Sequence, residues 1–224
     1  GDAVRWIALN ERGETVGRIA AFYDTQKDEA DYVRSGGCGI FESIDDQQVA
    51  FLLFDTAKAW LQENDYEAMT GPINFGENDT NWGCLVQGFR PQGLGMNYNL
   101  PYYKELFESY GFKLYYRQLS FHLDIVKPFP ERFCKISEWI NKRPGYSYKH
   151  FELKKTAQFV DDTAYIYDQA WSQLRKDYTP IDKASLYDEL RTIKMILDEE
   201  LIWYAYYKDE PIAFLMFLPD ANQI

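Results

Sequence analysis

The chain has 224 residues, 46% of them hydrophobic and 17% aromatic, enough for one large domain or for two of about a hundred residues each. Its 24 basic and 35 acidic side chains give a net charge of −11, which repels phosphate backbones, so no nucleic-acid partner is expected. The sequence contains no run of about five to eight basic residues and no apolar run of about 18 residues, so no membrane partner is expected either.

The cysteine and histidine content argues against a metal site. Three cysteines, Cys38, Cys84 and Cys134, have no metal-ligand spacing, and an odd number does not suit a closed disulfide framework. We expect all three to be reduced and buried. The two histidines, His122 and His150, form no zinc-binding or Ser-His-Asp pattern. The first residues resemble the inside of a strand more than a signal peptide, so we expect a cytoplasmic chain cut off at both ends.

Residues 1–126 alternate between strand and helix patterns. The expected elements are strands at 4–10, 15–23, 37–43 and 66–70, helices at 46–63 and 101–110, and strands at 113–118 and 119–125. The helix at 46–63 has the clearest pattern, because its apolar residues recur at steps of three and four. We expect it to pack across a sheet through Val49, Leu53, Ala57 and Trp60.

The segment Lys127-Pro128-Phe129-Pro130 interrupts these patterns and predicts a boundary between a domain at 1–126 and a domain at 127–224. The elements expected after it are a helix at 131–142, a strand at 147–154, helices at 157–176 and 183–197, and strands at 201–207 and 211–218.

A long segment rich in glycine and asparagine, residues 72–98, lies inside the first domain. Loops of this length within a domain are usually functional or irregular. We expect it, with the helix that follows, to surround a substrate or a small polar ligand. The candidate residues are Asn74, Asn78, Asp79, Asn81, Trp82, Asn99 and Tyr103.

The two hairpins of the chain align with each other. Trp6-Ile7-Ala8-Leu9 matches Trp203-Tyr204-Ala205-Tyr206, and Glu14-Thr15-Val16-Gly17 matches Glu210-Pro211-Ile212-Ala213 with one residue gapped. Two hairpins with polar loops can look alike by coincidence, so the match alone does not decide. A true repeat requires Trp6 and Trp203 to face the same side of their sheets, since a slip of one residue reverses every side chain.

The order of elements resembles that of the GNAT acyl-CoA N-acyltransferases. The most specific match is Asn99-Leu100-Pro101-Tyr102-Tyr103-Lys104-Glu105-Leu106-Phe107-Glu108-Ser109-Tyr110-Gly111-Phe112, which is similar to the family's N…A…Y-E-K-x-G-F helix. Residues 4–125 resemble the second strand onward, and residues 146–218 resemble strands 1 to 3 of another copy. The resemblance implies an α/β fold with mixed, mostly antiparallel sheets and flanking helices, in two tandem copies of which the second is incomplete.

The resemblance also implies an N-acyltransferase that uses acetyl-CoA or another acyl-CoA and a small-molecule amine. The family holds the pyrophosphate on a glycine-rich loop at a helix start, where this chain has Glu42-Ser43-Ile44-Asp45-Asp46. The carboxylates would repel that group, so we expect no cofactor at Asp45-Asp46. Phe107 replaces the tyrosine that the family often uses as general acid. Glu42 is the candidate base.

Two other functions remain open. A non-enzymatic protein could bind a small ligand on the same fold, through the long loop. An aminoacyl-transfer enzyme that uses charged tRNA is disfavoured by the net charge of −11.

Overall fold

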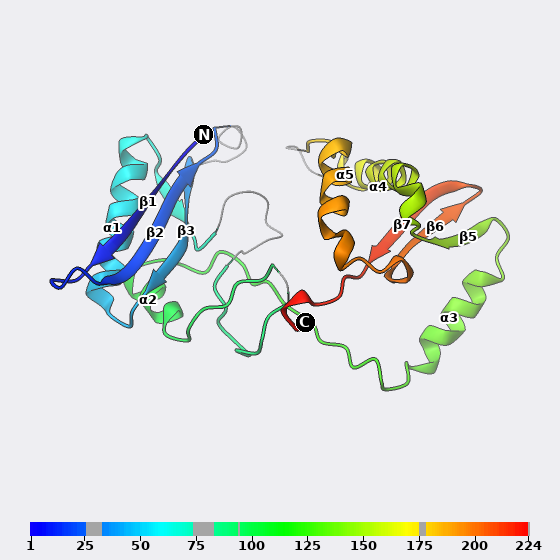
Figure 1. Ribbon diagram of the computed structural model, residues 1–224, viewed down its shortest axis with the longest axis horizontal. Coiled ribbons are helices and arrows are strands. Elements are labelled where there is room, and N and C mark those ends of the chain that lie inside the picture. The colour runs from blue at the N-terminus through cyan, green and yellow to red at the C-terminus, as the bar shows by residue number, and fades with distance from the viewer. Residues whose placement is uncertain (26–32, 74–82, 94, 175–177, 224) are drawn as a thin grey trace. The chain divides into compact units, whose positions relative to one another are not determined.

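The computed structural model describes residues 1–25, 33–73, 83–93, 95–174 and 178–223. They form two compact units, Gly1–Arg117 with the last residues from Asn222, and Gln118–Ala221 (Figure 1). The division follows Arg117, some residues before the boundary expected at 127. The fold class is mixed α/β with mainly antiparallel sheets, as predicted.

The first unit contains a sheet of four strands in the order β1-β2-β3-β4. The strands are β1 (Asp2–Leu9), β2 (Thr15–Tyr23), β3 (Ser35–Ser43) and β4 (Ala68–Thr70). The first three are antiparallel neighbours, and β4 is parallel to β3. A parallel pair needs a crossover connection, which helix α1 (Gln47–Glu63) provides. The four strands expected before residue 71 are thus confirmed.

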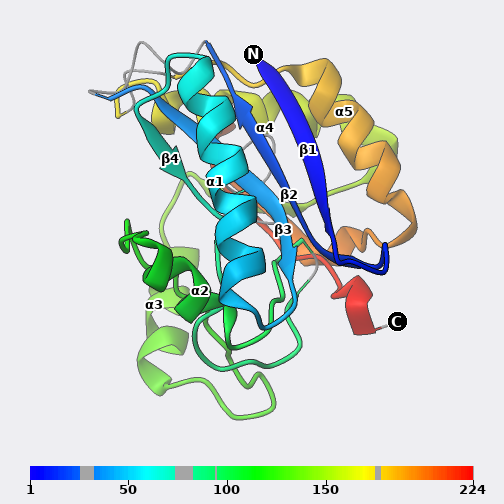
Figure 2. The same cartoon turned by 90° about the vertical axis from the view of Figure 1, so that its left-hand side faces the viewer.

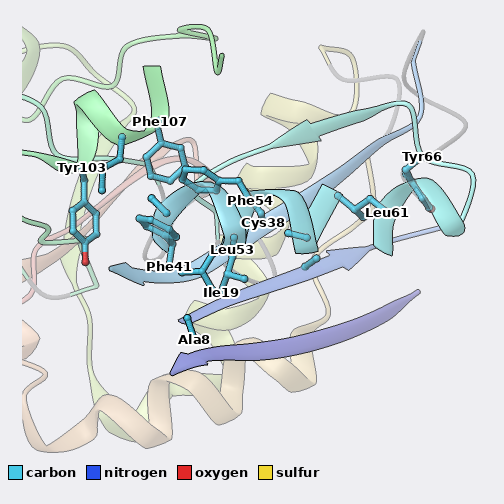
Figure 3. Close-up of a cluster of buried hydrophobic side chains, with 14 residues drawn as sticks. Ala8, Ile19, Cys38, Phe41, Leu53, Phe54, Leu61, Tyr66, Tyr103 and Phe107 are labelled. Atoms are coloured by element: carbon cyan, nitrogen blue, oxygen red, sulfur yellow. The ribbon is translucent and has the colours of Figure 1, made fainter. Parts of the chain in front are cut away.

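Helix α1 lies across the sheet (Figure 2). Its buried residues are Ala50, Leu53, Phe54, Ala57 and Leu61, of which Figure 3 labels Leu53, Phe54 and Leu61. The expected Val49 and Trp60 are partly buried and pack against this core. The helix approaches β2 closely. A Cβ at Gly17 would lie 2.8 Å from Leu53 Cδ1 and 2.9 Å from the Glu42 carbonyl oxygen, so this position needs glycine.

Helix α2 (Tyr103–Tyr110) ends at Gly111, whose φ of 115° suits a left-handed C-cap, and confirms the helix expected at 101–110. Phe107 is buried among aromatic rings, with centroids 5.1 Å from Phe41 and 4.8 Å from Phe54. The strands expected at 113–118 and 119–125 are wrong: this described stretch has no strand, and Tyr115 and Phe121 are almost fully exposed. An alternating pattern of apolar and polar residues forms a strand only where a neighbouring strand pairs with it and a core covers its apolar face.

The second unit contains a sheet in the order β5-β6-β7, all antiparallel. Its elements are α3 (Glu131–Asn141), β5 (Tyr146–His150), α4 (Thr156–Trp171), α5 (Lys183–Thr192), β6 (Ile202–Tyr207) and β7 (Glu210–Met216). Each expected helix and strand is present, although several end early. The strand expected at 147–154 stops at His150, because Leu153–Lys155 form a 3-10 turn.

The core of the second unit lies between α4 and β6. Phe151, Phe159 and Tyr204 are almost fully buried. The Tyr204 hydroxyl lies 2.7 Å from Thr163 Oγ1, so the polar atoms carried into this core satisfy each other. Cys134 is exposed on α3, which corrects the expectation of three buried cysteines, because no residue of α3 is buried.

Candidate functional site

The candidate ligand site of the first unit lies where β3 ends and α1 begins. The pairing of β2 with β3 shifts register between Arg18 and Ala20, and Ile40 opposite this shift has a φ of 48°. An extra residue with left-handed backbone is a β-bulge, a device that turns a strand end away from its ladder. Beyond the bulge the last residues of β3 are still paired with β2, Glu42 with Arg18 and Ser43 with Gly17, and α1 begins four residues later.

Asp46 occupies the amides at the start of α1. Its Oδ1 accepts hydrogen bonds from Gln48 N at 2.7 Å and from Val49 N at 3.3 Å. An N-cap carboxylate of this kind satisfies the donors that a helix start otherwise offers to an anion, and it places a negative charge at the positive end of the dipole. A phosphate at this helix start would have to displace the Asp46 carboxylate.

Two tyrosines hold the main chain of Ser43. Ile44 N donates to Val16 O. The backbone groups of successive residues in a strand point to opposite sides, so the N–H and C=O of Ser43 point away from β2. Ser43 N donates to the Tyr103 hydroxyl at 3.1 Å, and the Tyr102 hydroxyl donates to Ser43 O at 2.7 Å. Both hydrogen-bonding groups at the open edge of this strand end are therefore occupied by side chains of the same chain.

Tyr103 belongs to the aromatic core as well as to this site. Its ring packs edge-on against Phe41 at 5.3 Å, and the side chain is almost fully buried (Figure 3). Burial raises the pKa of the Tyr103 phenol above its ordinary value, so the hydroxyl keeps its proton at neutral pH. The sequence singled out Tyr103 as a ligand contact, and the structure shows it holding the backbone of β3.

Glu42 lies on the exposed face of β3, opposite Arg18 of β2. Its Oε1 is 2.7 Å from Arg18 Nη2. In the described residues Glu42 thus takes part in a surface ion pair, and its role as a base stays a prediction.

Asn99 fastens the loop that precedes α2. Its Oδ1 accepts from Leu85 N at 2.6 Å, and its Nδ2 donates to Leu85 O at 3.1 Å. Asn97 makes a similar bond to Gly83 O at 2.9 Å. The side-chain amides of Asn97 and Asn99 thus hydrogen-bond to backbone groups of the loop that have no partner in a helix or strand. The other five loop candidates, Asn74, Asn78, Asp79, Asn81 and Trp82, lie outside the described residues.

Sequence reasoning missed Tyr102 and Ser43. The two lie 59 positions apart in the chain and meet only through the fold. The signal that could have found Tyr102 is the pair of adjacent tyrosines at the start of the predicted helix, since a hydroxyl at a helix start can reach a neighbouring strand end.

Within the part of the chain that the structure describes, no group of three or more potential ligand side chains lies close enough to hold a metal. No helix among these residues is long and apolar enough to span a membrane.

Comparison with known proteins gives two relatives that match nearly the whole chain. Protein YghO of Escherichia coli (strain K12) is 26% identical over 223 residues, which are 97% of this chain and 55% of that protein. Bacterial ceramide synthase of Caulobacter vibrioides (strain NA1000 / CB15N) is 26% identical over 225 residues, which are 98% of this chain and 57% of that protein. The chain therefore spans little more than half the length of these relatives. No protein-family model matches it.

Solved structures named as acetyltransferases overlap with part of the chain. One from Pyrococcus furiosus is 20% identical, covers 56% of this chain and 67% of its own, and has a TM-score of 0.32. Another acetyltransferase is 14% identical, covers 56% of this chain and 70% of its own, and has a TM-score of 0.31.

Proposed function

We propose that this chain is part of an N-acyltransferase that transfers an acyl group from a coenzyme A thioester to an amine. The observation that carries the proposal is the relative named bacterial ceramide synthase, which aligns with 98% of this chain. A ceramide is the amide of a fatty acid and a long-chain amino alcohol. The acceptor class that we propose here is therefore a long-chain amino alcohol.

The proposed reaction joins the amine nitrogen to the thioester carbonyl carbon and breaks the carbon–sulfur bond. The nitrogen loses one proton to a base, and the coenzyme A thiolate gains one as it leaves. Backbone N–H groups that polarise the carbonyl would stabilise the negative charge on its oxygen.

The first unit is proposed to be a scaffold without chemistry of its own. Both main-chain groups of Ser43 are bound by tyrosine hydroxyls, and Asp46 caps the helix start. Phe107, at the position of the tyrosine expected from the resemblance, is enclosed by aromatic rings and has no proton to donate. The proposed thioester site accordingly lies outside this part of the first unit.

The second unit is proposed to begin another copy of the same fold. The two hairpins have equal registers for the aligned residues: Ala8 pairs with Gly17 and Ala205 with Ala213. Two residues outward, Trp6 pairs with Ile19 and Trp203 with Leu215. This agreement supports the repeat, because a coincidental match of loops would not preserve cross-strand pairs.

The two tryptophans have different surroundings. Trp6 packs beside Trp60 of α1, whereas Trp203 is 45% exposed, on the face of β6 opposite the buried Tyr204. Helix α1 follows its hairpin in the chain, and α4 and α5 precede theirs, so the covering helices are not equivalent elements. Trp6 therefore faces the core of its unit and Trp203 faces away from the core of its own, so the requirement that a true repeat places on the two tryptophans is not met, and the proposal rests on the matched register alone.

The test of acyl transfer is a product assay with the purified protein. A fatty acyl-CoA and a long-chain amino alcohol are supplied, and the amide is measured by mass spectrometry. We expect amide formation above the rate without protein, with release of one free thiol for each amide. Thiol release without amide would mean hydrolysis and would contradict the proposal, as would the absence of both products.

The site of the cofactor is tested by calorimetric titration with the same acyl-CoA. Binding is expected to survive in the Asp45→Lys, Asp46→Lys variant, because the cofactor does not use this helix start. A matched variant, Asp24→Lys, Asp2→Lys, adds equal charge elsewhere in the unit. Binding that disappears only in the Asp45, Asp46 variant would show that the helix start holds the cofactor after all.

A small-ligand-binding protein without catalysis is the second candidate function. The occupied groups at Ser43 favour it, since a strand end held by side chains suits a rigid binding scaffold. Binding of a long-chain amino alcohol without turnover of any acyl-CoA would support this alternative.

A further inference from the structure

Helix α3 presents an apolar stripe that nothing in the described structure covers. Phe133, Ile136 and Trp139 are 58%, 41% and 55% exposed. They recur at steps of three and so share one side of the helix. A shallow open groove beside the helix is lined only by residues of α3 itself. A helix of a globular protein ordinarily buries such a stripe, so the exposed stripe of α3 indicates a surface that binds a partner.

The extended stretch that leads to α3 continues this surface. Phe121, Ile125 and Val126 are 89%, 77% and 91% exposed, and Phe129 follows just before the helix. Exposed apolar side chains that occur singly need no explanation, but a continuous series of them marks an interaction site. The stretch and α3 belong to the same compact unit.

The charge of this region is opposite to that of the rest of the chain. Residues 119–143, which span this stretch and α3, contain five basic and three acidic residues, a net charge of 5 − 3 = +2, in a chain whose total is −11. The remaining residues therefore carry −11 − 2 = −13. A basic segment in an acidic protein selects a negatively charged partner, and the rest of the chain keeps other contacts away from it.

The charges on α3 are also sorted around the helix. With 3.6 residues per turn, Arg132 lies about 40° around the axis from Ile136, whereas Glu131 and Glu138 lie about 140° and 160° away. Arg143, just beyond the helix, places its guanidinium 3.7 Å from the Trp139 ring centroid. Arginines thus accompany the apolar stripe, while Glu131 lines the same groove as Ile136 and Trp139 and is paired with Lys135 at 2.8 Å.

Although the lack of a basic run in the sequence led to the expectation of no membrane partner, we propose that α3 and the stretch from residue 119 onward bind the surface of an anionic lipid bilayer. Aromatic side chains flanked by arginine and lysine are suited to the headgroup region, where the ring is buried and the charge meets lipid phosphate. The segment lies on the surface and does not cross it. This inference does not depend on acyl transfer, because it concerns a separate helix and needs no cofactor.

The experiment is co-sedimentation of the whole chain with vesicles, without acyl-CoA. One set contains phosphatidylcholine and phosphatidylglycerol at about two to one, and the other contains phosphatidylcholine alone. We expect binding to the anionic set at low salt and its loss at high salt, because the Debye length falls to about 3 Å at 1 M salt. Absence of binding to the anionic vesicles at low salt would overturn the proposal.

Two variants identify the surface. Replacing Phe133, Ile136 and Trp139 by serine should reduce the partition coefficient at least tenfold. Replacing Arg132 and Arg143 by glutamine should reduce it about 25-fold, since each basic side chain near an anionic surface contributes about fivefold. The matched control, Leu52→Ser with Met195→Ser, changes exposed apolar residues elsewhere and should bind as the unaltered chain does.

Cys134 offers an independent readout. It is the exposed one of the three cysteines and lies on α3, so it can be labelled with an environment-sensitive dye. We expect the fluorescence of the dye to rise on anionic vesicles only. A protein partner gives the opposite pattern: dimerisation in light scattering that the serine variant abolishes, with no change in the dye on vesicles, would show that a second copy covers α3.

Discussion

Removal of the Tyr103 hydroxyl measures how much its hydrogen bond with Ser43 N, at the end of β3, contributes to stability. In Tyr103→Phe the ring still packs against Phe41, so the change is confined to one hydroxyl. Ser43 N then loses its acceptor while it remains buried, since Ser43 is 6% exposed. A buried donor left without a partner costs about 1–3 kcal/mol. We expect the first unit to be destabilised by about that amount.

Tyr102→Phe is the companion variant. It removes the donor to Ser43 O, but Tyr102 is only half buried, so water can take its place. The expected cost is that of an ordinary hydrogen bond, about 0.5–1.5 kcal/mol. Tyr115→Phe, at a side chain that is 85% exposed, is the control and should leave stability unchanged.

The assay is amide hydrogen exchange followed by mass spectrometry, read on the peptides that contain β3. It reports the free energy of opening for this strand apart from the second unit, which a single unfolding curve of the whole chain would mix in. The reasoning is refuted if Tyr103→Phe opens no more easily than Tyr115→Phe, or if Tyr102→Phe proves the more damaging of the two tyrosine changes.

Three more predictions rest on the described core. Phe54→Ala should destabilise the first unit by about 3–5 kcal/mol in the same exchange assay, because Phe54 is fully buried among aromatic rings. Burial raises the pKa of Cys38 to about 12, so at pH 8 a thiol reagent should modify Cys134 rapidly and leave Cys38 unmodified until the protein unfolds. Burial and a hydrogen bond to Asp55 raise the pKa of Tyr110, so the stability that this phenol contributes should be present below pH 10 and lost above it, and Tyr110→Phe should flatten that alkaline decline.

The elements that the sequence predicted well are those whose signal is local. The apolar steps of α1 and the polar turn between β1 and β2 depend on neighbours a few residues apart, and the structure contains both. The strands expected at 113–125 failed because pairing is not local: the alternation is real, but no neighbouring strand receives it in the described residues. Cys134 was expected to be buried because the cysteine spacing suits neither a metal nor a disulfide framework, but spacing does not show whether the helix that carries a cysteine is covered, and no residue of α3 is buried.

The predictions for the candidate site also succeeded where the signal was local and failed where it was not. The expectation that acidic residues occupy the start of α1 was correct for Asp46, because capping is a local geometry. The bonds between Ser43 and the two tyrosines could not be predicted, since they join a strand end to a helix 59 and 60 positions later. Asn99 holds the loop backbone, and its expected contact with a ligand stays a prediction.

The occupied end of β3 also limits how this fold can change by mutation. A route toward a ligand site there must first remove a hydroxyl from Tyr102 or Tyr103, or the carboxylate of Asp46, and each of these now satisfies backbone groups of the chain itself. The first step of such a route therefore lowers stability before any ligand can restore it. Natural proteins are stable by only about 5–15 kcal/mol, so few lineages would pass through that step. Mutations at this strand end are therefore more easily accepted when they supply hydrogen-bond partners to the backbone groups of Ser43 and of the helix start than when they remove those partners.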